Sequence, residues 1–166
     1  MLKADLEYFQ EFLKEFQTET DRGVGLVGAA LLDKQLLDLL KSHFLKKKES
    51  IELLEGGTSP LGTFSSRIKI GFCLGLITEF ELKELQLIRK IRNEFAHQTH
   101  GLSFKNEKIA ISCNKFFDRM PDAKMKGIER TNRTKFIDAV IFMSLALWYR
   151  PHHAKKFRAE QRVWPY

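Results

Sequence analysis

The segment 136–149, FIDAVIFMSLALWY, constrains the fold more than any other part of the chain. It is apolar nearly all round a helix, so no face of it suits exposure to water. It is also shorter than the roughly 20 apolar residues that a membrane-spanning helix needs. We therefore expect a helix over about 128–150 that lies either in the centre of a helical core or in a dimer interface.

Four further helices are predicted along the chain. In residues 2–19, four apolar side chains follow the i, i+3, i+4, i+7 spacing of one buried face. A second helix is predicted over 22–45, and glycine and alanine in its first half would let another helix approach closely. The third is predicted over 61–75 and the fourth over 79–97, where Thr78 and Glu81 have the spacing of a capping box.

Together these segments predict an all-α fold, a compact bundle of about five helices. The segment 102–113 has a turn-like Lys-Asn-Glu between short apolar pieces, so we expect an irregular excursion or a small hairpin there. A length of 166 residues fits one domain, which we place at 1–150. Residues 151–166 are then a basic C-terminal tail.

The charge distribution is uneven along the chain. The net charge is +7, and residues 1–113 are neutral, with 16 Lys and Arg against 16 Asp and Glu. Residues 114–166 hold 12 Lys and Arg against 5 Asp and Glu, so they carry the whole excess. This asymmetry favours an anionic partner such as RNA or another nucleic acid. The alternative is a solvated basic tail that improves solubility.

The two cysteines, Cys73 and Cys113, argue against a disulfide framework or a zinc site, because they lack CxxC spacing. Cys73 lies in an apolar run, which predicts a buried structural thiol. The N-terminus has no apolar signal region. We expect a cytoplasmic protein with no membrane partner, no metal and no cofactor.

A group of polar side chains ends the predicted 79–97 helix, in the sequence RNEFAH. Asn93 and His97 are four residues apart and share a face, and Arg92 lies about 100° round the helix. Arginine suits phosphate, and histidine can serve as acid or base near neutral pH. The structural alternative is that Arg92 and Asn93 cap carbonyls at the helix C-terminus, where His97 would favour the helix dipole.

The same six residues fit R-N-x-x-x-H and resemble the signature of the HEPN superfamily. That resemblance implies a small, all-α, dimeric, metal-independent ribonuclease. Arg92 would hold the phosphate, His97 would transfer a proton and Asn93 would position either of them. A homodimer would supply one histidine for each proton transfer. The resemblance also implies a toxin or phage-defence setting, with a cognate antitoxin as partner.

A longer resemblance covers roughly residues 9–115. Residues 21–40 and 59–97, and above all the pattern PLGxFSxRIKIxxxLGLI, look like the mannitol operon repressor family of bacteria. This resemblance implies an all-helical transcriptional regulator without a recognisable helix-turn-helix motif, acting through a regulatory protein or nucleic acid.

Several other residues are candidate contacts for nucleic acid. The candidates are basic residues or lie near the RNEFAH motif: Arg67, His100, Lys155, Lys156 and Arg158. The alternative for Arg67 is an internal ion pair, because a buried arginine needs a partner. The lysine run 46–48 is expected to be a solvated loop.

These observations lead to two hypotheses. The first is a HEPN-like endoribonuclease that acts on RNA without a metal. The alternative is a non-enzymatic transcriptional regulator of the mannitol-repressor type. A helical fold accommodates both, so the sequence alone leaves the alternative open.

Overall fold

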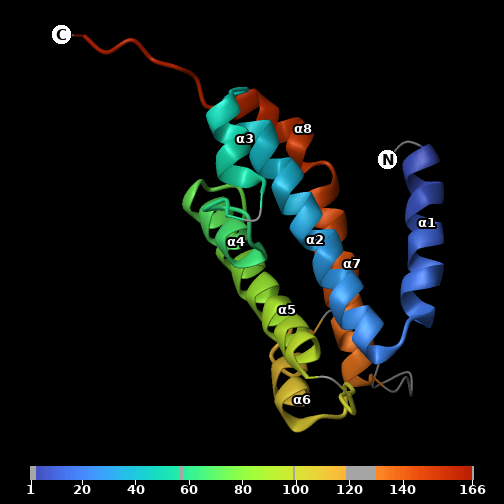
Figure 1. The fold of residues 1–166 in the computed structure, drawn as a ribbon. Coiled ribbons are helices and arrows are strands. Elements are labelled where there is room, and N and C mark those ends of the chain that lie inside the picture. Colours follow the sequence, from blue (N-terminus) through green and yellow to red (C-terminus); the bar gives the residue numbers. More distant parts are fainter. Residues whose placement is uncertain (1–2, 57, 99, 119–129, 166) are drawn as a thin grey trace. The chain divides into compact units, whose positions relative to one another are not determined.

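The regular structure is helical throughout residues 3–56, 58–98, 100–118 and 130–165, which are the residues that the computed structural model describes (Figure 1). The predicted all-α class is therefore confirmed. The helices are α1 (Lys3–Thr18), α2 (Asp21–His43), α3 (Lys48–Leu54), α4 (Phe64–Cys73), α5 (Glu79–His97), α6 (Glu107–Cys113), α7 (Asn132–Trp148) and α8 (Arg150–Ala154), followed by the 3-10 helix η2 (Lys155–Phe157).

The short helices are the main departures from the predicted elements. For the segment 102–113 we expected an irregular excursion or a small hairpin. Residues 102–106 are irregular, but the hairpin is wrong, because α6 occupies the rest of the segment. Asn106, which looked like a turn residue, caps α6 by accepting a hydrogen bond from the Lys108 amide at 3.2 Å. The expected tail contains α8, whose first turn accommodates Pro151 because proline is well suited to that position. The expected start of the last helix, near 128, lies outside the described residues.

The chain divides into two compact units. Unit 1 comprises residues 1–30 and 87–141, and unit 2 comprises residues 31–86 and 142–166. The helices α2, α5 and α7 each contribute residues to both units. A single domain over 1–150 stays a prediction.

Unit 1 has an aromatic core. The Phe104 ring lies 5.1 Å from Phe95 and 5.3 Å from Phe136, measured between ring centroids, and all three side chains are buried. Gly25 of α2 faces this cluster so closely that an added Cβ would lie 2.4 Å from the Phe95 ring. The expectation that small residues in α2 permit close packing is therefore confirmed in unit 1.

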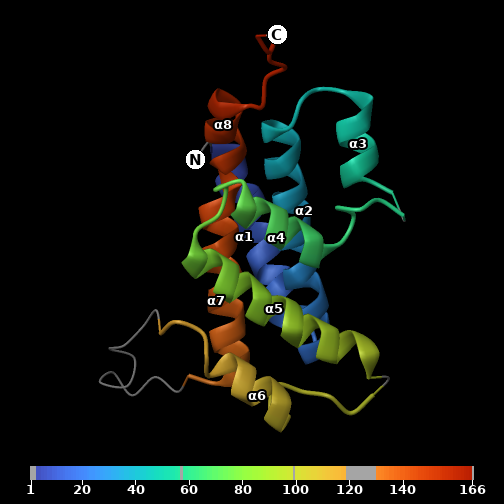
Figure 2. The ribbon, with the colours of Figure 1, turned by 90° about the vertical axis from the view of Figure 1, so that its left-hand side faces the viewer.

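Unit 2 has an aliphatic core. The fully buried side chains include Leu32, Leu36, Leu39, Leu40, Leu54, Ile68, Leu85 and Met143. Both views place α3 beside the last turns of α2 (Figures 1 and 2). After η2 the chain is fastened to the end of α2, where Arg158 Nε donates to the Ser42 carbonyl at 3.0 Å and the Ala159 amide donates to the His43 carbonyl at 2.8 Å. We call these two contacts the α2 strap.

The cysteines differ from their predicted environments. Cys73 is exposed, so the expected burial is wrong: α4 buries the face that carries Arg67, Ile68 and Gly71, and Cys73 lies off that face. Cys113 is buried in unit 1, and this burial raises the pKa of its thiol to about 12. None of the described helices combines the length and apolar character needed to cross a membrane.

Candidate functional site

The three predicted catalytic residues of the RNEFAH motif, Arg92, Asn93 and His97, lie in the last two turns of α5, within unit 1. Arg92 and His97 are exposed, and Asn93 is half-buried. The Arg92 guanidinium donates to the Asn93 side-chain oxygen through Nη1 at 3.2 Å. This places a cation and an imidazole on an open helix surface. The catalytic roles of these residues stay predictions.

The predicted nucleic-acid contacts are divided between the two units. His100 is exposed in unit 1, whereas Lys155 and Lys156 are exposed on η2 in unit 2. Arg158 belongs to the α2 strap. Arg67 is only 7% exposed and is bound internally.

Arg67 illustrates how this chain uses a buried guanidinium. Its Nη1 donates to Asp33 Oδ1 at 2.8 Å, and its Nη2 donates to the Leu54 carbonyl at 2.9 Å. These bonds join α4 to α2 and α3 within unit 2. The structure thus contains the internal ion pair that the sequence offered as the alternative for Arg67.

Several basic side chains of the C-terminal third are also used internally. Arg133 pairs with Asp21 at 2.8 Å and donates to the carbonyls of Gln17 and Glu19. The second oxygen of Asp21 accepts the Phe104 amide at 3.0 Å. Nearby, Arg130 pairs with Asp118 and Asp138. These residues, which we call the Asp21 network, adjoin a cavity of about 440 Å³ lined by Asp21, Phe104, Lys105, Arg130, Thr131, Asn132 and Arg133.

A second internal arginine pair lies in unit 2. Arg150 binds both oxygens of Glu81, at 2.6 and 2.7 Å, and donates to the Leu76 carbonyl at 3.2 Å. The Thr78 amide donates to Glu81 at 2.8 Å and the Glu81 amide donates to the Thr78 hydroxyl at 3.2 Å, which confirms the predicted capping box. Burial by itself would raise the pKa of Glu81, but the hydrogen bonds from Arg150 and Thr78 outweigh it and lower that pKa.

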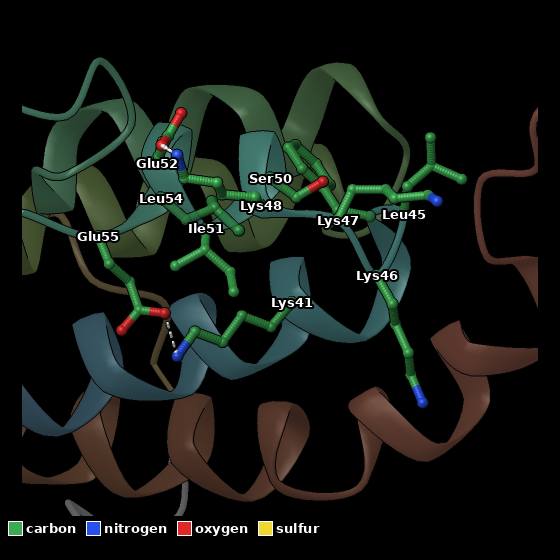
Figure 3. Close-up of a pocket in the computed structure, with 11 residues that line it drawn as sticks. Lys41, Leu45, Lys46, Lys47, Lys48, Ser50, Ile51, Glu52, Leu54 and Glu55 are labelled. Atoms are coloured by element: carbon green, nitrogen blue, oxygen red, sulfur yellow. Dashed lines mark ion pairs between the residues drawn. The ribbon is translucent and has the colours of Figure 1, made fainter.

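A larger pocket lies between the end of α2 and α3, entirely within unit 2 (Figure 3). Its volume is about 670 Å³. The lining residues are Lys41, Phe44, Leu45, Lys46, Lys47, Lys48, Ser50, Ile51, Glu52, Leu54 and Glu55. We call it the lysine-rimmed pocket. Figure 3 shows Ile51 projecting from α3 toward Lys41 on α2.

Ion pairs account for half of the lysines around this pocket. Lys41 pairs with Glu55 at 2.5 Å, and Lys48 pairs with Glu52 at 3.1 Å. Sequence reasoning missed the pocket, because it treated the lysine run 46–48 as a solvated loop, whereas Lys48 begins α3. The signal that could have revealed it is the i, i+3 spacing of Ile51 and Leu54 directly after the lysines.

Among the described residues, no group of three or more His, Cys, Asp or Glu side chains gathers in a way that could hold a metal ion.

Comparison with known proteins identifies the class to which this fold and these surfaces belong. A family model described as the mannitol repressor matches residues 10–155. This match covers most of the chain, and the chain belongs to the mannitol repressor family.

Individual relatives agree with this assignment. The mannitol operon repressors of Escherichia coli K12 and of Escherichia coli O6:H1 are each 29% identical to the chain over 89 residues. The matched region is 51% of this chain and 46% of each repressor, so the chain matches about half the length of these curated relatives. A chain in the X-ray structure of the MtlR–HPr complex from Escherichia coli has a similar fold, with a TM-score of 0.65 and 19% identity, over 83% of this chain and 96% of that one.

These matches contradict the first functional hypothesis. The family model, the curated relatives and the solved structure all point to mannitol repressors. The predicted HEPN-like endoribonuclease, with its toxin or phage-defence setting, is therefore wrong as the main function. Six residues at a helix end are too short a motif to outweigh a match over 10–155. The alternative hypothesis, a transcriptional regulator, agrees with the findings.

Proposed function

We propose that the chain is a non-enzymatic transcriptional regulator of the mannitol-repressor type, which acts through contact with a protein partner. The observation that carries this proposal is the family match over residues 10–155. The partner we propose is a protein of the HPr type, because the similar fold was solved in a complex with HPr.

The use of arginine favours a protein partner over nucleic acid. Binding to nucleic acid relies on exposed cations that displace counterions from the phosphates. In this chain, Arg67, Arg130, Arg133 and Arg150 are bound by carboxylates within the fold. Exposed cations such as Lys155 and Lys156 remain for direct contact with nucleic acid, which is a secondary route for the same regulator.

Two measurements test the proposed function. The first is calorimetric titration of the purified chain with HPr from the same organism, where we expect saturable binding. The second is a reporter fused to the mannitol operon promoter of that organism, where deletion of the gene should raise expression and its return should lower it. Absence of both effects would overturn the proposal. Binding to promoter DNA that weakens steeply with salt, without binding to HPr, would move the proposal to the nucleic-acid route.

We also propose that the regulator is a homodimer, because unit 2 exposes an apolar surface on α7. Phe142 and Leu145 are each 45% exposed, and Phe142 lies 6.2 Å from Phe80, which is 39% exposed. Contiguous apolar side chains of this kind mark protein interfaces. Light scattering after size-exclusion chromatography should give a dimer for the wild type and a monomer for Leu145→Glu. A monomeric wild type would contradict the proposal.

A further inference from the structure

The lysine-rimmed pocket leaves apolar surface open to water beside a row of cations. Ile51 is 56% exposed and Leu45 is 36% exposed, although both line the pocket. Leu54, which is 1% exposed, forms part of the inner wall. The pocket volume of about 670 Å³ falls in the range of about 300–1,000 Å³ that is typical of natural binding pockets.

The charge around the pocket is unbalanced. Four lysines and two glutamates line it, and the two glutamates are paired with Lys41 and Lys48. Lys46 and Lys47 therefore supply the surplus positive charge, and both are exposed. An occupant that matches these features needs apolar side chains for the inner wall and negative charges for the rim.

We infer that the lysine-rimmed pocket binds an acidic amphipathic helix of a partner protein. Apolar side chains of that helix would enter between α2 and α3 and contact Ile51 and Leu54. Carboxylates on the flanks of that helix would meet Lys46 and Lys47. This is the helix-in-groove mode of recognition, in which apolar anchors supply affinity and complementary charge sets orientation and association rate.

The same features disfavour other occupants. Single-stranded nucleic acid needs aromatic platforms for its bases, whereas aliphatic side chains predominate among the apolar lining residues. A small anionic amphiphile has the same negative charge and apolar character as an acidic amphipathic helix. The experiment below distinguishes these two occupants. The inference rests on the proposed function, because it supplies the surface by which a regulator meets a protein partner.

The probe is a synthetic helix-forming peptide with leucines at i, i+3, i+4 and i+7 on one face and glutamates on the others. Two control peptides accompany it: one has lysines in place of the glutamates, and the other has the same composition in scrambled order. Each peptide carries a fluorescent label, and binding to the full chain is followed by anisotropy. We expect the acidic amphipathic peptide to bind at least about tenfold more tightly than either control. Its affinity should also fall with salt, because added ions screen exposed charges.

Variants of the chain assign the binding to this pocket. The double substitution Lys46→Glu and Lys47→Glu should lower the affinity for the acidic peptide at least about tenfold. Ile51→Glu alone should do the same. Matched controls are Lys69→Glu, an exposed lysine on α4, and Val27→Glu, an apolar side chain of α2 that is 37% exposed. Both controls should stay within about twofold of the wild type. Circular dichroism melts establish that every variant is folded.

Three outcomes would overturn the inference. The first is equal binding of all three peptides, which indicates a nonspecific apolar surface. The second is binding of the acidic peptide that the pocket variants leave unchanged. The third is saturable binding of decanoate, lost in Ile51→Glu, with no binding of the peptide, which makes this a site for a small amphiphile. The HPr titration and the promoter reporter use none of these peptides, so the proposed function succeeds or fails independently.

Discussion

The Asp21 network of unit 1 and the lysine-rimmed pocket of unit 2 both gather basic side chains, but they use them in opposite ways. In the network, Arg133 is bound by one carboxylate and two backbone carbonyls, and Arg130 is bound by two carboxylates. In the pocket, Lys46 and Lys47 stand exposed on the rim. The arginines of the Asp21 network stabilise the fold of unit 1, whereas Lys46 and Lys47 present positive charge to solvent.

The difference follows from the two kinds of side chain. A guanidinium is planar and holds several donors in fixed directions, so it can satisfy several acceptors at once inside a fold. An ammonium is strongly hydrated and sits on a flexible stem, so it stays at the surface. The count of 28 lysines and arginines therefore overstates the number of cations available for binding, because several arginines are paired with carboxylates inside the fold.

Thiol labelling gives the largest contrast between the units, because Cys113 lies in unit 1 and Cys73 lies in unit 2. Cys73 is exposed and should react within minutes at pH 8 with an aromatic disulfide reagent. The pKa of Cys113, about 12, leaves only about one thiolate in ten thousand at that pH, and burial blocks access as well. We expect labelling of Cys113 to be at least about a thousandfold slower, followed by absorbance and peptide mass spectrometry. Similar rates for both thiols in the native protein would mean that unit 1 opens readily.

The Glu81–Arg150 pair tests whether internal arginine pairs support stability in unit 2 as well. Glu81→Ala leaves the Arg150 guanidinium without its carboxylate and removes an acceptor from the Thr78 amide. We expect a loss of about 3 kcal/mol in the free energy of unfolding, measured with urea. The control is Glu79→Ala, whose carboxylate pairs with Lys83 on the open surface and should give no measurable change. Equal effects of the two substitutions would contradict this prediction.

The same pair predicts a pH dependence. Because the pKa of Glu81 is lower in the folded protein than its ordinary value of 4.5, the folded state holds the ionised form more strongly than the unfolded state does. This contribution to stability is present above pH 4.5 and is lost as the pH falls through the lower folded pKa. Urea unfolding below pH 4.5 should show a smaller acid-dependent loss in Glu81→Gln than in the wild type. If the free energy of unfolding fell with pH equally in both proteins, carboxylates other than Glu81 would account for the acid-dependent loss of stability.

The Asp21 network offers a milder test in unit 1. Asp21→Asn keeps the shape of the side chain but removes the charge that pairs with Arg133, and the side chain is 31% exposed. We expect a loss of about 2 kcal/mol in the free energy of unfolding, together with faster labelling of Cys113. Asp38→Asn is the control, because the Lys34–Asp38 pair lies on the surface and should contribute about 0.5 kcal/mol or less. If only Cys73 were labelled faster, Asp21→Asn would have loosened unit 2 and not unit 1, which would contradict this prediction.

The lysines of the pocket should matter least for stability. The double substitution Lys46→Glu and Lys47→Glu should change the free energy of unfolding by less than about 0.5 kcal/mol, because exposed charges contribute little. Thermal and urea unfolding provide the measurement. A loss near 2 kcal/mol would show that these lysines hold the fold, and the contrast with the Asp21 network would disappear.

The sequence predicted the parts of this fold that depend on local pattern. Apolar patterns located the long helices. The Thr78–Glu81 spacing identified a capping box that the structure contains, and glycine in α2 indicated the close approach seen at Phe95. The PLGxFSxRIKIxxxLGLI pattern also indicated the family that the comparison confirmed.

Features that depend on distant residues escaped prediction. Asp21 and Arg133 are 112 positions apart, and no local pattern links them. The environment of Cys73 depends on which face of α4 packs inward, which an apolar run does not specify. The RNEFAH motif misled for the same reason: its residue types describe a possible chemistry, but the activity depends on surroundings that six residues do not encode.

The α2 strap determines how a mechanical load would enter the molecule. A pull on the segment after Ala159 acts first on the hydrogen bonds to Ser42 and His43, before any force reaches η2 or α8. A surface tether or bulky fusion attached at Tyr166 would therefore transmit force to the last turn of α2. This turn also forms one wall of the lysine-rimmed pocket.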